Sequence, residues 1–166
     1  EAKNPSLENK EAVAHAVGVG AVIFHDLKND RTNNFDFALE EVVQFEGEAG
    51  PYVQYTHARA MSILRKANHT VDTQAAFSLT DDDAWEVLKL IENYPNVVRF
   101  AEEKCEPSAI AKFVINLAQA FNKYYAHTKV LVEDEAFNSR IALVQTTASL
   151  LKQGLALLGV AAPDEM

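Results

Sequence analysis

Apolar side chains recur every three to four positions along most of the chain, which is the spacing of one face of an α-helix. No clear run alternates apolar and polar residues as a half-buried strand does. The sequence therefore predicts a mainly α fold, with Ser6 as the cap of the first helix. The predicted helices cover residues 6–27, 36–45, 51–66, 80–94, 95–104, 107–127 and 137–158.

The ends of these helices are predicted from residues that favour caps and breaks. Pro51 suits the first turn of its helix, because no intrahelical hydrogen bond is lost there. Thr80 and Asp83 resemble a capping box, and Pro95 is expected to end one helix and begin another. Gly159 suits the position after the last helix, where a left-handed backbone is common.

The chain has 166 residues, of which 48% are hydrophobic, so it is long enough to bury a core in one large or two small domains. The stretch "GEAGP" at 47–51 is the best candidate for a boundary. We therefore expect a first part at 1–50 and a helical bundle at 51–166. Because the chain begins with Glu1 rather than Met, we also expect it to be part of a longer protein.

Several classes of protein are disfavoured by composition. No window approaches the roughly eighteen uninterrupted apolar residues of a membrane span, and the first residues lack the pattern of a signal peptide. A single cysteine, Cys105, allows no internal disulfide and indicates a reducing, cytoplasmic setting. The five histidines lack metal-ligand spacing, and no residue stands in a recognisable nucleophile motif. We predict no metal site and no catalytic residue.

The distribution of charge is more informative than its total. The net charge of −9 disfavours nucleic acid, since phosphate binding depends on Lys and Arg. Residues 1–50 hold ten acidic and four basic residues, and residues 72–106 hold nine and three. Residues 51–69 and 107–132, in contrast, hold three Lys or Arg each and no acid. These two basic islands indicate a polyanionic partner, although solvated helix faces also produce such a pattern.

The helix predicted at 51–66 has one face on which aromatic and basic groups alternate. A rotation of about 100° per residue gathers Tyr55, Arg59 and Lys66 on that face. Such a face can stack on a nucleotide base while a cation contacts phosphate, and an ordinary solvated face is the alternative. His57 lies toward the apolar side, so we interpret it as a hydrogen-bonded core histidine.

The helix predicted at 107–127 has the same character. Tyr124 falls on its apolar stripe, while Asn122 and Tyr125 lie at the border between the apolar and polar faces. A ring at such a border can stack on an unpaired base for about 1–3 kcal/mol. Trp85, on a neighbouring helix, is expected in the core or an interface.

Three stretches resemble one family. Residues 17–67, which include "NFDFALEEVVQFEGEAGPYVQYTHARA", resemble the end of the catalytic core and the first anticodon-domain helix of bacterial arginyl-tRNA synthetases. The later "LAQAFNKYYAHTKVL" at 117–131 and "RIALVQTTASLLKQGLALLGVAAPDEM" at 140–166 are similar to the helical anticodon-binding domain of these enzymes. The stretches occur in the family's order and together cover nearly the whole chain.

The resemblance implies a DALR-type helical bundle at 51–166, preceded at 1–50 by a short helical linker from a class I catalytic core. These enzymes use ATP to ligate arginine to its tRNA. Their His-Ile-Gly-His-like and Lys-Met-Ser-Lys-like motifs do not occur in this sequence. The chain alone is therefore expected to be inactive and to hold no cofactor, whereas the full-length enzyme would use ATP with Mg.

The resemblance also implies anticodon contacts at Asn122, Tyr124, Tyr125 and Met166. The helix-face analysis adds Tyr55 and Arg59. The implied partner is tRNA specific for arginine, with no DNA and no membrane. A non-catalytic helical module that binds another protein is the alternative.

Overall fold

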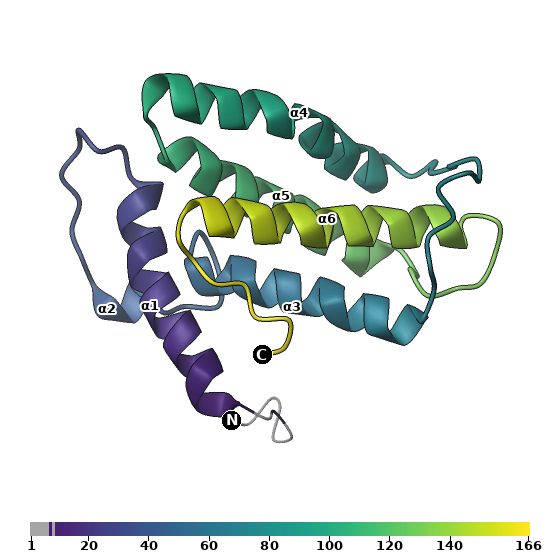
Figure 1. Cartoon of the computed structure of the whole chain (residues 1–166), viewed down its shortest axis with the longest axis horizontal. Helices are drawn as coiled ribbons and strands as arrows, with labels where there is room; N and C mark the ends of the chain where they lie inside the picture. Colours follow the sequence, from purple (N-terminus) through teal and green to yellow (C-terminus); the bar gives the residue numbers. More distant parts are fainter. Residues whose placement is uncertain (1–6, 8) are drawn as a thin grey trace.

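The computed structural model describes residue 7 and residues 9–166, so the predicted cap at Ser6 lies outside it. The described residues form helices and no strand, which confirms the mainly α prediction. Figure 1 shows α3 to α6 side by side along the long axis, with α1 packed across one end. The helices are α1 (Lys10–Lys28), α2 (Leu39–Val42), α3 (Gly50–Ala67), α4 (Asp82–Lys104), α5 (Ser108–His127) and α6 (Phe137–Leu157).

Helix α5 is the centre of the bundle, because it packs against α1, α3, α4 and α6. Its buried face follows the predicted apolar stripe and includes Phe113, Leu117, Phe121 and Tyr124. Burial of side chains of this size typically stabilises a fold by about 1.5–3 kcal/mol each. The position of α5 therefore fixes which residues lie at its two borders.

Gly154 allows α5 and α6 to pack closely. A Cβ atom at this position would lie 2.3 Å from Cγ1 of Val114 on α5. A larger residue fits only if Val114 or one of the helices shifts, so this glycine allows the close packing of α5 and α6.

The end of α6 directs the rest of the chain back over the bundle. Gly159 has φ +71°, and the N–H of Val160 donates to the carbonyl oxygen of Leu155 at 2.9 Å. Together with the bond from the N–H of Gly159 to Ala156, this is a Schellman turn, as the glycine predicted. In Figure 1 the segment that follows α6 ends beside α3.

The predicted break at Pro95 is wrong, because α4 continues through it to Lys104. A proline inside a helix costs roughly 3 kcal/mol. Packing of α4 against α5 offsets this cost, and the rings of Tyr94 and Phe113 lie 5.0 Å apart across the contact. The residues around Pro95 alone do not reveal the stabilisation that comes from packing against α5.

The predicted capping box is also wrong. The N-cap of α4 is Asp81 rather than Thr80, and its side chain makes no capping hydrogen bond. Asp81 instead accepts a hydrogen bond from the Thr128 hydroxyl at 3.1 Å, and Asp83 pairs with α5. These acidic side chains connect two helices rather than cap one.

Two further expectations differ from the structure. The helix predicted at 36–45 is reduced to the four residues of α2. Trp85 is 60% exposed, which contradicts the core alternative for this residue, because Ala84 and Val87 supply the face of α4 that meets the core. None of the described helices is both long and apolar enough to cross a lipid bilayer.

Candidate nucleic-acid interface

Four of the six predicted site residues come together where α3 meets α5. Tyr55 and Arg59 come from α3, and Asn122 and Tyr125 come from α5; we call them the α3–α5 cluster. The guanidinium carbon of Arg59 lies 4.9 Å from the ring centre of Tyr55 and 5.8 Å from that of Tyr125. At these distances both rings attract the cation. One arginine thus links two tyrosines from different helices.

Asn122 fixes this arrangement through all parts of its amide. Its Oδ1 accepts a hydrogen bond from Nη1 of Arg59 at 2.5 Å. Its Nδ2 donates to the Tyr52 hydroxyl at 3.0 Å and to the Thr56 hydroxyl at 2.9 Å. Both amide hydrogens are therefore used inside the protein. The sequence analysis missed Tyr52 and Thr56, although their spacing from Arg59 places all three on one side of α3.

Tyr125 is partly exposed and contacts a buried ring of its own helix. Its ring lies nearly parallel to the buried ring of Phe121, at a centroid distance of 6.4 Å and an angle of 19°. The side chain is nevertheless 40% exposed, as its border position predicted. A ring that is held by neighbours and still partly exposed can stack on a flat ligand without much loss of freedom.

Tyr124 differs from the other predicted contacts. It is fully buried, and burial raises the pKa of its hydroxyl far above the usual range. This is the core position that helical projection predicted. In this conformation the ring has no exposed surface with which to contact an RNA.

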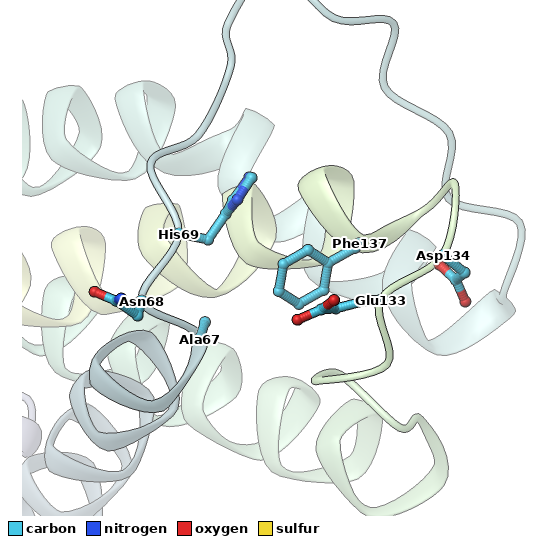
Figure 2. Close-up of a pocket in the computed structure, with 6 residues that line it drawn as sticks. All are labelled: Ala67, Asn68, His69, Glu133, Asp134 and Phe137. Atoms are coloured by element: carbon cyan, nitrogen blue, oxygen red, sulfur yellow. The ribbon is translucent and has the colours of Figure 1, made fainter.

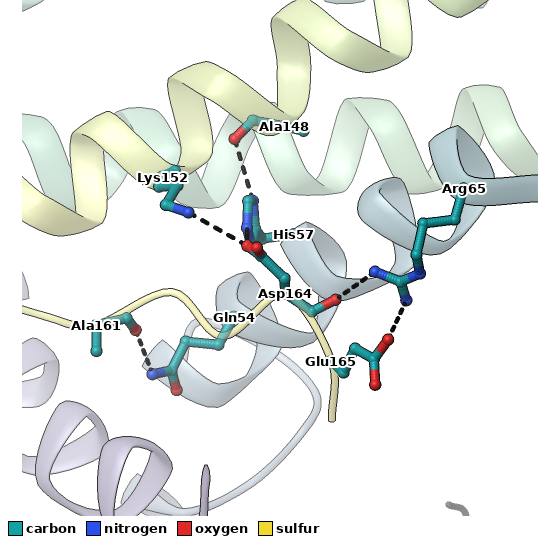
Figure 3. A network of polar contacts seen from close by, with 8 residues as sticks. All are labelled: Gln54, His57, Arg65, Ala148, Lys152, Ala161, Asp164 and Glu165. Carbon is teal, nitrogen blue, oxygen red and sulfur yellow. Dashed lines mark hydrogen bonds and ion pairs between the residues drawn. The ribbon is translucent and has the colours of Figure 1, made fainter. Parts of the chain in front are cut away.

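Met166 ends the tail that follows α6, and this tail is bound to α3 (Figure 3). The Gln54 side-chain amide donates to the carbonyl oxygen of Ala161 at 2.7 Å, and Arg65 pairs with Glu165 at 3.2 Å. The half-exposed end of the chain is thus fixed to the helix that carries Tyr55 and Arg59. His57 is buried beside the tail with both ring nitrogens in hydrogen bonds, as a core histidine should be.

Part of the second basic island is neutralised by α4. Oδ1 of Asp83 lies 2.7 Å from Nζ of Lys123, and Oδ2 of Asp83 lies 2.6 Å from Nδ1 of His127. Hydrogen bonds from Lys123 and then His127 lower the pKa of the Asp83 carboxyl, and Asp83 in turn raises the pKa of Lys123. Counting cations in the sequence therefore overestimates how many are available to a polyanion.

A shallow hollow near the start of α6 is a weaker candidate for a binding site than the α3–α5 cluster (Figure 2). It is lined by Ala67, Asn68, His69, Glu133, Asp134 and Phe137. His69 is hydrogen-bonded to Asn138 at 2.9 Å, and Arg140 pairs with Asp134 and lowers the pKa of its carboxyl. In the part of the chain that the structure describes, no three His, Cys, Asp or Glu side chains could hold a metal ion together.

Comparison with known proteins assigns most of the chain to one domain family. Residues 53–166 match the family model of the DALR anticodon binding domain. An arginine–tRNA ligase of Enterococcus faecalis is 65% identical over 164 residues, which are 99% of this chain and 29% of that protein. One from Streptococcus thermophilus is 59% identical over 166 residues, which are 100% of this chain and 30% of that protein. The chain thus spans about 30% of the length of these curated relatives.

Solved structures agree with this assignment. The arginyl-tRNA synthetase of Thermus thermophilus superimposes with a TM-score of 0.89 and 36% identity, over 99% of this chain and 29% of that one. The enzyme of Plasmodium falciparum gives a TM-score of 0.87 at 25% identity, over 94% of this chain and 28% of that one. The predicted bundle is confirmed, and the similarity extends in front of residue 53.

Proposed function

This chain belongs to the DALR anticodon-binding domain family of arginyl-tRNA synthetases, and we propose that it binds the anticodon arm of a tRNA specific for arginine. The observation that supports this most directly is the α3–α5 cluster, in which a cation and a half-exposed ring stand side by side. Anticodon loops present unpaired bases, which proteins recognise by stacking and by hydrogen bonds to base edges.

Each member of the cluster has a distinct role in this proposal. Tyr125 offers the exposed part of its ring to an unpaired base, with Phe121 and Arg59 beside it. Arg59 supplies positive charge beside that base, and its planar guanidinium can itself stack. Asn122 contributes by holding Arg59, since both of its amide hydrogens already bind α3.

The rest of the reaction belongs to the longer protein in this proposal. That protein ligates arginine to its tRNA with ATP and Mg in the cytoplasm, and this chain alone forms no arginyl-tRNA when given ATP, arginine and tRNA. Residues 1–50 would link the bundle to the catalytic core. In support, large apolar side chains are exposed along this part, at Val19, Val22, Phe35, Phe37, Leu39, Val43 and Phe45.

Titration with a transcribed arginine tRNA tests the proposal. Tyr125→Ala removes one stacking ring, so we expect affinity to fall roughly 5- to 150-fold, the equivalent of about 1–3 kcal/mol. Trp85→Ala is the matched control, because it also removes an exposed aromatic side chain but on α4. We expect its affinity to remain that of the unmodified chain.

A second tRNA with a different anticodon provides the specificity arm. Tighter binding of the arginine tRNA supports anticodon recognition. Equal affinity for both tRNAs, or equal losses in the Tyr125 and Trp85 variants, would refute it and favour a module that binds another protein.

A further inference from the structure

Residues 159–166 return from the end of α6 and lie against α3, although they are far from it in sequence (Figure 3). Val160 is buried and Ala162 is partly buried against the core. Asp164 and Glu165, in contrast, are exposed, so polar contacts rather than apolar burial hold the last residues. Contacts of the tail with α3 side chains include Gln54 to Ala161 at 2.7 Å, His57 to Asp164 at 3.0 Å and Arg65 to Glu165 at 3.2 Å.

His57 is the buried member of this set, with 1% of its surface exposed. Its Nδ1 lies 3.1 Å from the carbonyl oxygen of Ala148 on α6, and its Nε2 lies 3.0 Å from Oδ1 of Asp164. A carbonyl oxygen only accepts, so Nδ1 carries a hydrogen. Each ring nitrogen of His57 therefore lies within hydrogen-bond distance of an oxygen atom, one on α6 and one on the tail.

Two basic side chains, Lys152 and Arg65, also contact Asp164. Nζ of Lys152, on α6, lies 3.2 Å from Oδ1 of Asp164, and Nη1 of Arg65 donates to the Asp164 backbone carbonyl at 3.2 Å. The hydrogen bond from His57, and then that from Lys152, lowers the pKa of the Asp164 carboxyl. Asp164 is thus the point where α3, α6 and the tail are joined.

We propose that His57 is a positioning residue for RNA binding: by holding Asp164 it fixes the chain end at Met166 against α3, the helix that carries Tyr55 and Arg59. This inference rests on the proposed function. A tail that is ordered before the RNA arrives does not lose its conformational freedom during binding, so affinity improves without a new contact. His57 itself is buried and acts only through Asp164.

Asp164→Ala in the full 166-residue chain is the main test, because this side chain is only half buried and its loss leaves the core intact. Asp134→Ala is the matched control: the two carboxylates are 48% and 49% exposed, and each lies within hydrogen-bond distance of a nitrogen of a buried side chain, His57 for Asp164 and Arg140 for Asp134. Asp164→Asn keeps an oxygen that can accept from His57 and should recover most of the function.

Two measurements are made on each variant. The first is the methyl signal of Met166 in ¹³C-methyl-methionine NMR spectra, which contain one other methionine, Met61 on α3. We expect the Met166 signal to narrow in Asp164→Ala as the chain end becomes mobile, while the Met61 signal keeps the width of a folded helix. The second is affinity for an arginine tRNA transcript, which should fall roughly five- to tenfold in Asp164→Ala and stay unchanged in Asp134→Ala.

Deletion of Met166 separates positioning from general stability. The deletion should weaken RNA binding in the unmodified chain. In Asp164→Ala it should cause little further loss of affinity, because both changes remove the same ordered chain end. Additive losses, or a mobile Met166 with unchanged affinity, would overturn the positioning role. If the unmodified chain does not bind the tRNA, the proposed function fails and the positioning role falls with it, whereas binding without loss in Asp164→Ala overturns the positioning role alone.

Discussion

Asn122→Ala should lower stability more than an asparagine substitution at a protein surface does. The change removes one hydrogen bond with a charged partner, Arg59, and two with the hydroxyls of Tyr52 and Thr56. Net values are typically about 1.5–3 kcal/mol for the first kind and about 0.5–1.5 kcal/mol for each of the others. Because the contacts are only partly buried, we expect the free energy of unfolding to fall by about 2–3 kcal/mol.

Urea denaturation measures this loss, and tRNA titration of the folded variant measures the functional one. Asn96→Ala is the control, since Asn96 lies exposed on α4 and bonds only a neighbouring surface side chain, Asn93, at 3.2 Å. We expect its stability to stay within about 0.5 kcal/mol of the unmodified chain. If Asn122→Ala keeps full stability but loses most RNA affinity, its amide contacts RNA rather than α3, and the reasoning given for this residue is refuted.

Two further predictions concern the bundle itself. Gly154→Ala would favour an isolated helix by about 1 kcal/mol, but the clash with Val114 should lower the free energy of unfolding by about 1–3 kcal/mol in urea; unchanged stability would contradict the close approach of α5 and α6. The pKa of the Asp83 carboxyl is lowered from the ordinary value of 3.8 by its bonds to Lys123 and His127. These bonds therefore stabilise the fold fully at pH values above 3.8, and the stabilisation is lost as the pH falls through the lowered pKa. The melting temperature of the unmodified chain should therefore exceed that of Asp83→Asn near about pH 6, and the gap should close in strong acid; a gap that does not change with pH would contradict this.

Two helix ends followed from local signals in the sequence. Pro51 and Gly159 lie at the start of α3 and just after α6, where their restricted or left-handed backbones fit. Pro95 failed as a signal because the decisive term is the contact between α4 and α5, which no local pattern contains. The core prediction for Trp85 failed for a related reason. Periodicity locates the apolar face of a helix, but it does not determine which side chains of that helix the neighbouring helices bury.

The helix faces on which the residues of the α3–α5 cluster lie were predictable from the sequence, but their meeting in space was not. Helical projection placed Tyr55 with Arg59 on α3, and Tyr125 at the border of α5. Their meeting depends on how α3 and α5 pack, and therefore on core side chains between the helices. The bond between His57 and Asp164 joins residues 107 positions apart, so no spacing rule could have found it.

The contacts of the two basic islands predict a weak dependence of RNA binding on salt. Arg59, Arg65 and Lys123 each already bond a side-chain oxygen of another residue. The other Lys and Arg residues of the islands are Lys66, Lys112 and Lys129, all exposed. Each phosphate neutralised on a single strand contributes about −0.7 to the slope of log affinity against log salt concentration, so three lysines give a slope of about −2 at most. Titrations of arginine tRNA at several salt concentrations measure this slope. A slope steeper than about −4 would show that RNA breaks the ion pairs of the free chain.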